Sequence, residues 1–284
     1  MDYLIYNRLA DNGHAEEEAK KVFEDLKAKN WTIELVCSND KPLAELFKMM
    51  KGEDRAILLG GDGTLNYLIN HFEEIPAVPL FLLPSGTGND FFNDVKEDNK
   101  RDDGLVPLNA YLTNLPKIDV NGKTYRFING IGFGIDGECC VKADEMKAAG
   151  AEKIDYSSIT LKLLFGPFVP RIAKCKVDGV EIPELKKTYL ASAMNGRYYG
   201  GGMKIAPEQK RNSGHLTLVV IHGKGKLGTF MMFPGLFKGT HVKKKKNTLV
   251  KTGKVIEVEF DTPCGLQIDG EVVKDVKSYK AYLD

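Results

Sequence analysis

The stretch AILLGGDGTLN, residues 56–66, joins a short apolar run to a glycine-rich loop. Residues 56–59 are typical of a strand buried on both faces, and residues 65–72 have the apolar spacing of a helix. Glycine admits positive φ and close backbone approach, so residues 60–64 can direct N–H groups at a phosphate where the helix begins. A tight strand-to-helix turn is the alternative, but it needs fewer than three glycines in four residues. The pattern favours a phosphate-binding loop.

A second loop of the same kind follows the next apolar run. Residues 79–83 read as a strand, and PSGTGND, residues 84–90, comes directly after it. Because the carboxyl ends of parallel strands meet at one edge of a sheet, both loops are expected there. Small residues with hydroxyl and amide groups suit phosphates and a ribose, so the two loops together indicate a nucleotide site.

Strand and helix patterns alternate throughout the first part of the chain. Residues 3–6 and 33–37 read as strands, whereas residues 15–26 and 43–50 have helical spacing. This alternation predicts a parallel sheet with crossover helices, a Rossmann-like α/β domain that extends to about residue 118.

The later part of the chain has the pattern of a β-rich domain. Asn121-Gly122 and Asp178-Gly179 are hairpin signals, and further strand-like runs occupy residues 189–194, 216–221, 255–260 and 265–273. We expect a β-rich sandwich domain over residues 119–277 and a cleft between the two domains. The GxGxxG pattern of residues 132–137 opens no clear βαβ unit and is interpreted as a flexible turn.

Length and composition restrict the class of protein. A chain of 284 residues with 43% hydrophobic and 28% charged residues can bury the cores of two globular domains. The formal net charge of +1 gives no general attraction to nucleic acid, so no nucleic-acid partner is predicted. The five cysteines are scattered without zinc-site spacing. Without a signal-peptide pattern or a long apolar run, the protein is expected to be cytoplasmic.

Five segments resemble the bacterial diacylglycerol kinase and related lipid kinase family. GGDGTLN at 60–66 and LLPSGTGND at 82–90 are similar to its catalytic domain, and IDGE at 268–271 is similar to its C-terminal Asp-Gly-Glu motif. Residues 7–13 resemble its N-terminal loop, and residues 133–136 fall where it has a Gly-Phe-Asp element. The likeness covers nearly the whole chain. It implies a two-domain fold shared with NAD kinases, in which residues from about 278 to 284 return to the first domain.

The resemblance also implies an activity, namely transfer of the γ-phosphate of ATP to a lipid hydroxyl, with diacylglycerol as the first expected acceptor. Magnesium would be bound through the nucleotide phosphates. Asp62 would orient the phosphates or a metal-bound water, Asp269 would act as base, and Glu271 would support it. Without the family, a hairpin turn explains Asp269 equally well. The nucleotide-binding residues implied are Asn7, Gly60, Gly61, Asp62, Gly63, Thr64, Ser85, Gly86, Thr87 and Asn89.

The sequence departs from the family at two places. Arg8 and Asp11 replace proline and glycine in the N-terminal loop, and NSGHL at 212–216 replaces an acidic element that holds a structural magnesium ion in some members. No metal-binding residue is therefore assigned. The alternatives are an NAD kinase-type phosphotransferase and a catalytically inactive nucleotide- or lipid-binding protein. Formation of NADP would favour the first, and nucleotide binding without transfer would favour the second.

A basic and apolar region suggests contact with a membrane surface. Lys238 and residues 243–246 are basic, and residues 230–233 are apolar. Basic residues near an anionic lipid surface contribute about 1 kcal/mol each, although core packing is the commoner explanation of apolar residues. Because a lipid kinase must reach its substrate, we expect transient membrane contact and a peripheral location. Homodimerisation is left open.

Overall fold

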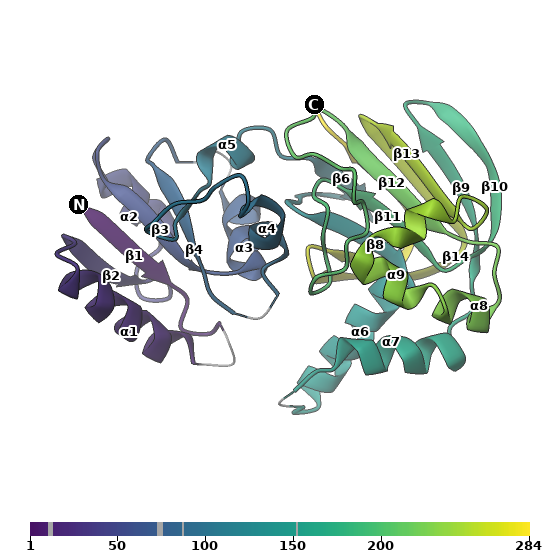
Figure 1. The fold of residues 1–284 in the computed structure, drawn as a ribbon, viewed down its shortest axis with the longest axis horizontal. Helices are drawn as coiled ribbons and strands as arrows, with labels where there is room; N and C mark the ends of the chain where they lie inside the picture. Colours follow the sequence, from purple (N-terminus) through teal and green to yellow (C-terminus); the bar gives the residue numbers. More distant parts are fainter. Residues whose placement is uncertain (11–13, 73–75, 87, 152) are drawn as a thin grey trace. The chain divides into compact units, whose positions relative to one another are not determined.

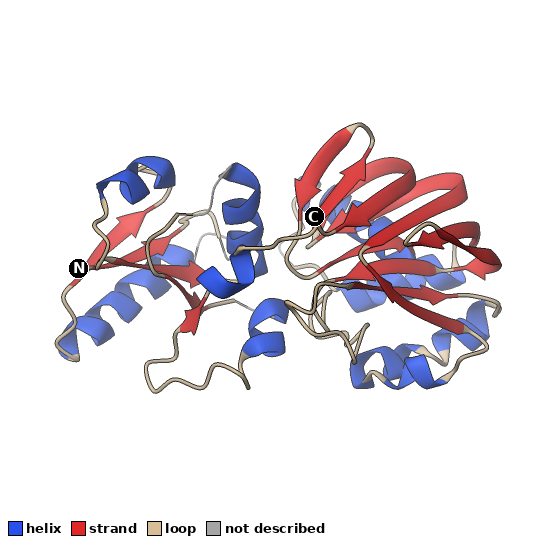
Figure 2. Cartoon of the chain, turned by 90° about the horizontal axis from the view of Figure 1, so that it is seen from above, coloured by secondary structure: helices blue, strands red, loops and turns tan. Residues whose placement is uncertain are grey.

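The chain divides into two compact units, Met1–Thr113 and Asn114–Asp284. The computed structural model describes residues 1–10, 14–72, 76–86, 88–151 and 153–284. Helices and strands alternate in the first unit, whereas strands dominate the second (Figures 1 and 2). The expected fold class, an α/β domain followed by a β-rich sandwich, is confirmed.

The first unit is built on a sheet with the strand order β2-β1-β3-β4-β5. The first four strands in this order pair in parallel, and β5 pairs antiparallel to β4. The elements in chain order are β1 Asp2–Tyr6, α1 Ala15–Ala28, β2 Ile33–Cys37, α2 Leu43–Met49, β3 Arg55–Gly60, α3 Asp62–His71, β4 Leu80–Pro84, α4 Asp90–Val95, β5 Val106–Pro107 and α5 Asn109–Leu112.

The core of this unit explains why its central strand is apolar throughout. In β3 every residue after Arg55 is buried. Leu4, Ile57 and Leu59 pack in one cluster with Ala19 and Leu26 of α1. Removing such side chains from water contributes about 1.5–3 kcal/mol each, which ties α1 to the sheet.

Helix α3 begins three residues earlier than its apolar spacing indicates. Its first residue is Asp62, and the N–H groups of Thr64 and Leu65 already bond to the carbonyl of Gly61. The apolar pattern starts only at Leu65 because the first turn is the glycine-rich loop itself, which has no core-facing side chains. The residues of the glycine-rich loop therefore form the amino end of a helix.

The second unit is an antiparallel sheet that folds over itself. Its strand order is β13-β12-β11-β8-β14-β15-β6-β7, and β9 joins β10 to β14. The elements are β6 Lys117–Val120, β7 Lys123–Arg126, β8 Gly130–Gly134, α6 Ile135–Ala148, α7 Tyr156–Phe165, β9 Arg171–Val177, β10 Val180–Thr188, β11 Leu190–Met194, β12 Leu216–Ile221, α8 Lys226–Phe230, α9 Phe233–Lys238, the 3-10 helix η2 Thr240–Lys243, β13 Thr248–Gly253, β14 Val255–Ile268 and β15 Glu271–Tyr282.

Both predicted hairpins are present in this unit. Asn121-Gly122 joins β6 to β7 and Asp178-Gly179 joins β9 to β10, each with positive φ at both turn residues. Asparagine, aspartate and glycine tolerate this conformation, and the turn matches the twist of the flanking strands. A third turn of this kind, Asp269-Gly270, interrupts the run of residues 265–273 that was expected to form one strand.

The end of the chain stays in the second unit, contrary to the expected return to the first. Strand β15 pairs with β14 along its length, and Tyr279 to Tyr282 also pair with β6. Tyr279, Ala281 and Leu283 are buried in the sandwich core. This alternating apolar face is satisfied within the second unit, so the first unit ends at Thr113 and not with residues 278–284 added.

The GxGxxG pattern of residues 132–137 is not a flexible turn. Gly132 and Gly134 belong to β8, and Gly137 lies in the first turn of α6. A Cβ on Gly137 would lie 2.0 Å from the carbonyl oxygen of Gly265, and one on Gly132 would lie 1.8 Å from a carboxylate oxygen of Asp136. These glycines are required because α6 packs closely on β14 and β8.

Candidate functional site

The two glycine-rich loops of the first unit lie side by side. They follow neighbouring parallel strands, and the last residues of those strands, Gly60 and Pro84, are in register. The N–H of Ser85 donates to the carbonyl of Gly60 over 3.0 Å. The prediction that both loops leave the same sheet edge is confirmed.

Hydrogen bonds to the Asp62 carboxylate connect the two loops. Its two carboxylate oxygens accept hydrogen bonds from the N–H groups of Asp90 (2.8 Å) and Phe91 (2.9 Å), at the amino end of α4. A carboxylate stabilises a helix amino end by neutralising its partial positive charge and pairing its N–H groups. In the structure Asp62 joins the two loops, and the orienting role implied by the resemblance stays a prediction.

The glycines of the two loops fall into two groups. A Cβ on Gly60 would lie 2.1 Å from the hydroxyl of Thr64, and one on Gly61 would lie 2.8 Å from the amide oxygen of Asn89. By contrast, a Cβ on Gly63 or Gly86 would meet nothing within 4 Å. Gly60 and Gly61 are thus needed for contact between the loops, and Gly63 and Gly86 leave space above the backbone.

The loops carry polar groups that fit a nucleotide. Among the described residues, no side chain caps the amino end of α3. N–H groups at such an end favour a phosphate. Asn89, in the left-handed conformation with φ of 47°, donates from Nδ2 to the carbonyl of Gly86, while its buried Oδ1 finds no hydrogen-bond partner in the part of the chain that the structure describes. A ribose hydroxyl is a donor that this oxygen could accept from. Thr87 lies outside the described residues.

Two of the other predicted nucleotide residues bond within the protein. The Ser85 hydroxyl donates to Glu18 Oε2 over 2.5 Å, which ties the second loop to α1. Asn7 Oδ1 accepts from the N–H of Leu9 over 2.9 Å, so this side chain stabilises the turn after β1. In the same turn Arg8 forms an ion pair with Asp40, while Asp11 lies outside the described residues.

Asp269, in the second unit, is held by a loop that lies 140 residues earlier in the chain. Its carboxylate accepts from the N–H of Ile128 (2.6 Å), Asn129 (2.8 Å) and Gly130 (2.9 Å). It occupies the turn between β14 and β15 with φ of 49°. The hairpin-turn interpretation is therefore correct for its backbone, and the side chain is in addition a firmly oriented carboxylate. Glu271 begins β15 beside it and is exposed.

A buried polar network, which the motifs did not indicate, supports this turn. Gln267 Nε2 donates to Asp136 Oδ2 over 2.9 Å, and Gln267 Oε1 accepts from the N–H of Gly270 over 2.7 Å. Burial raises the pKa of Asp136 from its usual value near 3.8 to about 6, and hydrogen bonds from Gln267 and Tyr199 oppose the shift only in part. The sequence offered no clear signal, because Gln267 alternates with the core residues Leu266 and Ile268 and so reads as a position on the other face of the strand.

The raised pKa of Asp136 predicts a specific dependence of stability on pH. Because the folded state favours the protonated form, this stabilisation is complete below about pH 4 and is lost as the pH rises through about 6. Between pH 4 and pH 7, we expect the free energy of unfolding of Asp136→Asn to rise relative to wild type by about 1–3 kcal/mol. Urea denaturation at several pH values measures this difference. A difference that stays constant over the range would contradict it.

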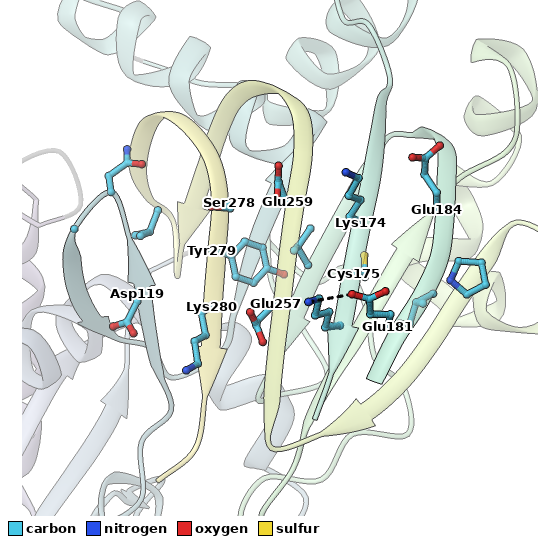
Figure 3. A pocket seen from close by; sticks show the side chains of 17 residues that line it. Asp119, Lys174, Cys175, Glu181, Glu184, Glu257, Glu259, Ser278, Tyr279 and Lys280 are labelled. Atoms are coloured by element: carbon cyan, nitrogen blue, oxygen red, sulfur yellow. Dashed lines mark ion pairs between the residues drawn. The ribbon is translucent and has the colours of Figure 1, made fainter. Parts of the chain in front are cut away.

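The second unit has a hollow that is lined by none of the predicted site residues. It measures about 840 Å³ and lies on a sheet face made by β6, β15, β14, β9 and β10 (Figure 3). The register places residues of alternating charge across it, namely Asp119, Lys280, Glu257, Lys176 and Glu181. Lys176 and Glu181 form an ion pair at 3.1 Å. Cross-strand pairs of opposite charge stabilise an exposed sheet face, and none of the predicted site residues lines this one.

Two protein-family models match this chain, one in its first part and one in its second part. The family model described as the diacylglycerol kinase catalytic domain matches residues 3–117. A second, the YegS C-terminal NAD kinase beta sandwich-like domain, matches residues 129–280, which is more than half of the chain.

Individual relatives are distant but cover most of the chain. A diacylglycerol kinase of Mycobacterium tuberculosis is 26% identical over 263 residues, which is 90% of this chain and 84% of the relative. YtlR of Bacillus subtilis, named only provisionally as a lipid kinase, is 24% identical over 235 residues, covering 77% of this chain and 74% of its own.

A solved structure has the same fold. The crystal structure of a diacylglycerol kinase from Bacillus anthracis matches 99% of this chain and 93% of its own, with a TM-score of 0.66 and 23% identity. Membership of a kinase family implies ATP as the phosphate donor. The two family models together show that the chain belongs to the diacylglycerol kinase family of lipid kinases.

Proposed function

We propose that this protein transfers the γ-phosphate of ATP, bound with magnesium, to the hydroxyl of diacylglycerol and so forms phosphatidic acid. The observation that carries the proposal is the pair of glycine-rich loops joined by Asp62. The proposal is supported further by family membership, and by relatives that are named diacylglycerol kinases.

The residues of the first unit would bind the nucleotide. The N–H groups at the amino end of α3 would donate to phosphate oxygens, and Gly63 and Gly86 would allow those oxygens to approach the backbone. Asn89 Oδ1 would accept from a ribose hydroxyl. A magnesium ion on the phosphates would neutralise charge that develops during transfer.

Asp269 would act on the acceptor in this proposal. Its three N–H bonds fix the carboxylate in one direction, so that it can orient the lipid hydroxyl and take its proton. Stabilisation by three donors makes a carboxylate a weak base. A weak base suffices here, because phosphoryl transfer proceeds through a loose transition state in which positioning and charge stabilisation provide most of the rate.

The decisive experiment offers labelled ATP with magnesium to several acceptors in parallel. Diacylglycerol, monoacylglycerol and a sphingoid base are presented in mixed micelles, and NAD is presented in solution. Labelled phosphatidic acid above the level of the Asp269→Asn variant is the expected result. Labelling of NAD alone would replace the proposal with an NAD kinase activity, and ATP binding without labelling of any acceptor would replace it with a catalytically inactive binding protein.

A basic and apolar surface of the second unit supports contact with an anionic membrane. More than half of the exposed large apolar side chains among the described residues lie on α7, α8, α9 and the loop after α7, namely Tyr156, Phe165, Val169, Leu227, Phe230, Met231 and Phe237. Phe165 and Phe230 stack edge to face, and Lys226 Nζ donates to the carbonyl of Gly166. These contacts join α7 to α8, and α9 follows α8 directly in the chain. We call the exposed side chains of these three helices and their connections the docking surface; Figure 1 labels the helices.

The charges of the segment that carries α8 and α9 favour an anionic partner for the docking surface. Residues 209–256 contain no aspartate or glutamate and eleven basic residues, namely Lys210, Arg211, Lys224, Lys226, Lys238, Lys243, Lys244, Lys245, Lys246, Lys251 and Lys254. A two-fold dimer through this surface would bring lysines against lysines. Apolar side chains on a segment rich in lysine instead suit anionic headgroups over acyl chains. No helix among the described residues has the length and apolarity to cross a bilayer.

A single charge substitution tests the docking surface. Met231 is 69% exposed on it, and Met49, in the first unit, is 65% exposed and serves as the matched control. We expect Met231→Glu to reduce cosedimentation with phosphatidylglycerol-containing vesicles about 10-fold, through lost apolar insertion and charge repulsion. Met49→Glu should bind as wild type does. Equal binding by both variants, or a dimer that Met231→Glu disrupts, would contradict membrane docking.

A further inference from the structure

Arg211 holds the same loop that holds Asp269. Its Nη1 donates to the carbonyl of Ile128, and its Nη2 donates to Asn129 Oδ1. Asn129 is 2% exposed. The three N–H groups of this loop point to the Asp269 carboxylate, so the loop lies between a guanidinium and a carboxylate.

One peptide group connects the two charges directly. The carbonyl of Ile128 and the N–H of Asn129 belong to the same peptide bond; the carbonyl accepts from Arg211, and the N–H donates to Asp269 Oδ1 over 2.8 Å. A cation on the carbonyl oxygen draws electron density from the peptide and strengthens its N–H as a donor. The positive charge of Arg211 thereby acts on the Asp269 carboxylate through this peptide.

Other contacts keep this peptide in place. Asn195 Nδ2 also donates to the carbonyl of Ile128 over 2.9 Å, and the N–H groups of Asn195 and Gly196 donate to the carbonyl of Asn129. The N–H of Asp269 donates back to the carbonyl of Gly130 over 3.1 Å. Arg211 contributes a formal positive charge to this arrangement.

The residues that follow Arg211 in the chain bear on the role of its positive charge. Arg211 directly precedes residues 212–216, which contain no aspartate or glutamate. In the part of the chain that the structure describes, no cluster of three or more histidine, cysteine, aspartate or glutamate side chains could hold a metal. A guanidinium is charged at every physiological pH and needs no metal to be present.

We propose that Arg211 is a positioning residue for Asp269 and serves as a built-in cation in place of a bound metal ion. It organises the Ile128–Asn129 peptide so that the carboxylate is held in the orientation needed for the acceptor hydroxyl. The proposal rests on the kinase function proposed above. It further implies that activity depends on magnesium only as far as ATP requires the ion.

Kinetic measurements on Arg211→Ala and Arg211→Lys test the proposal. We expect Arg211→Ala to lower kcat about 10- to 100-fold with little change in KM for ATP, since a charge-assisted contact is lost far from the nucleotide loops in sequence. Guanidinium ion at millimolar concentration should restore part of that kcat. Arg211→Lys keeps the charge but cannot reach both acceptors with a fork, so an intermediate kcat is expected.

Arg171 provides the matched control, because its guanidinium also donates to main-chain carbonyls of the second unit, those of Val169 and Pro263. Arg171→Ala should keep its kcat and show no rescue by guanidinium. If Arg211→Ala does not fold, the comparison rests on Arg211→Lys. A wild-type kcat for the folded Arg211 variant, or a requirement for free magnesium beyond saturation of ATP, would overturn the proposal.

Hydrogen exchange separates this proposal from the kinase proposal. The amides of Ile128, Asn129 and Gly130 should exchange faster in Arg211→Ala than in wild type or in Arg171→Ala, whether or not any lipid is phosphorylated. Unchanged exchange would overturn the role of Arg211. Transfer to no lipid together with faster exchange would refute the kinase function and leave the contact itself established.

Discussion

Replacement of Asp269 by asparagine is expected to lower phosphate transfer about 10²- to 10⁴-fold, the range typical of a lost general base. Asparagine tolerates the left-handed backbone at this position, where φ is 49°. The aspartate carboxylate accepts the three N–H bonds with two oxygens, whereas the asparagine amide has only one oxygen. Its NH₂ group would face N–H donors of the Ile128–Gly130 loop. ATP affinity should not change, because the residues proposed to bind the nucleotide belong to the first unit. Transfer assays and calorimetric ATP titration measure the two effects.

Asp178 offers a matched control for this substitution. It occupies the corresponding position of another two-residue turn, with φ of 50°, and its carboxylate accepts from the N–H groups of Lys254 and Val255. Asp178→Asn therefore reproduces the change in chemistry and conformation away from the proposed site. We expect this variant to lose stability but to keep its kcat. Equal loss of transfer in both variants would show that Asp269 acts only through the stability of the unit.

Replacement of Asp62 by alanine is expected to abolish measurable transfer and to weaken ATP binding about 10- to 100-fold, since charge-assisted bonds contribute roughly 1.5–3 kcal/mol each. The cause is the loss of the bonds to Asp90 and Phe91, after which the two nucleotide loops are no longer joined. The effect on ATP binding distinguishes Asp62→Ala from Asp269→Asn. Calorimetric titration with ATP measures it directly.

Asp155 is the matched control for Asp62. Its carboxylate likewise accepts from two N–H groups at the amino end of a helix, those of Ser157 and Ser158 at the start of α7. Asp155→Ala should cost about 0.5–2 kcal/mol in stability, as the loss of a helix cap does, and leave ATP affinity unchanged. Wild-type ATP affinity in Asp62→Ala would show that joining the loops has no part in nucleotide binding.

Local patterns were sufficient for most of the secondary structure. The apolar run of β3 and the Asn121-Gly122 turn depend on burial and on backbone torsions, which neighbouring residues largely determine. The start of α3 was missed because apolar periodicity reports only residues that face the core, and its first turn is a glycine-rich loop. The placement of β15 was missed because strand pairing is a long-range property.

The candidate site likewise contains features that the sequence predicted and features that it did not. The two glycine-rich loops could be found and placed at one sheet edge from the sequence, because each directly follows an apolar strand. The partners of Asp62 and Asp269 could not be found, since they lie 28 and about 140 residues away in the chain. Arg211 and Gln267 belong to no recognised motif. Hydrogen bonds in the folded structure connect Arg211 to the loop that holds Asp269, and Gln267 to Gly270.

The amino-acid sequence by itself therefore determined the class of fold, the kinase family and the two glycine-rich loops, because these depend on periodicity and on short motifs. Only the tertiary structure decided what each carboxylate contacts: Asp62 joins two loops, and Asp269 accepts from a peptide whose carbonyl accepts from Arg211. The physical reason is that a hydrogen bond depends on distance and direction between two atoms, which folding sets for residues far apart in the chain.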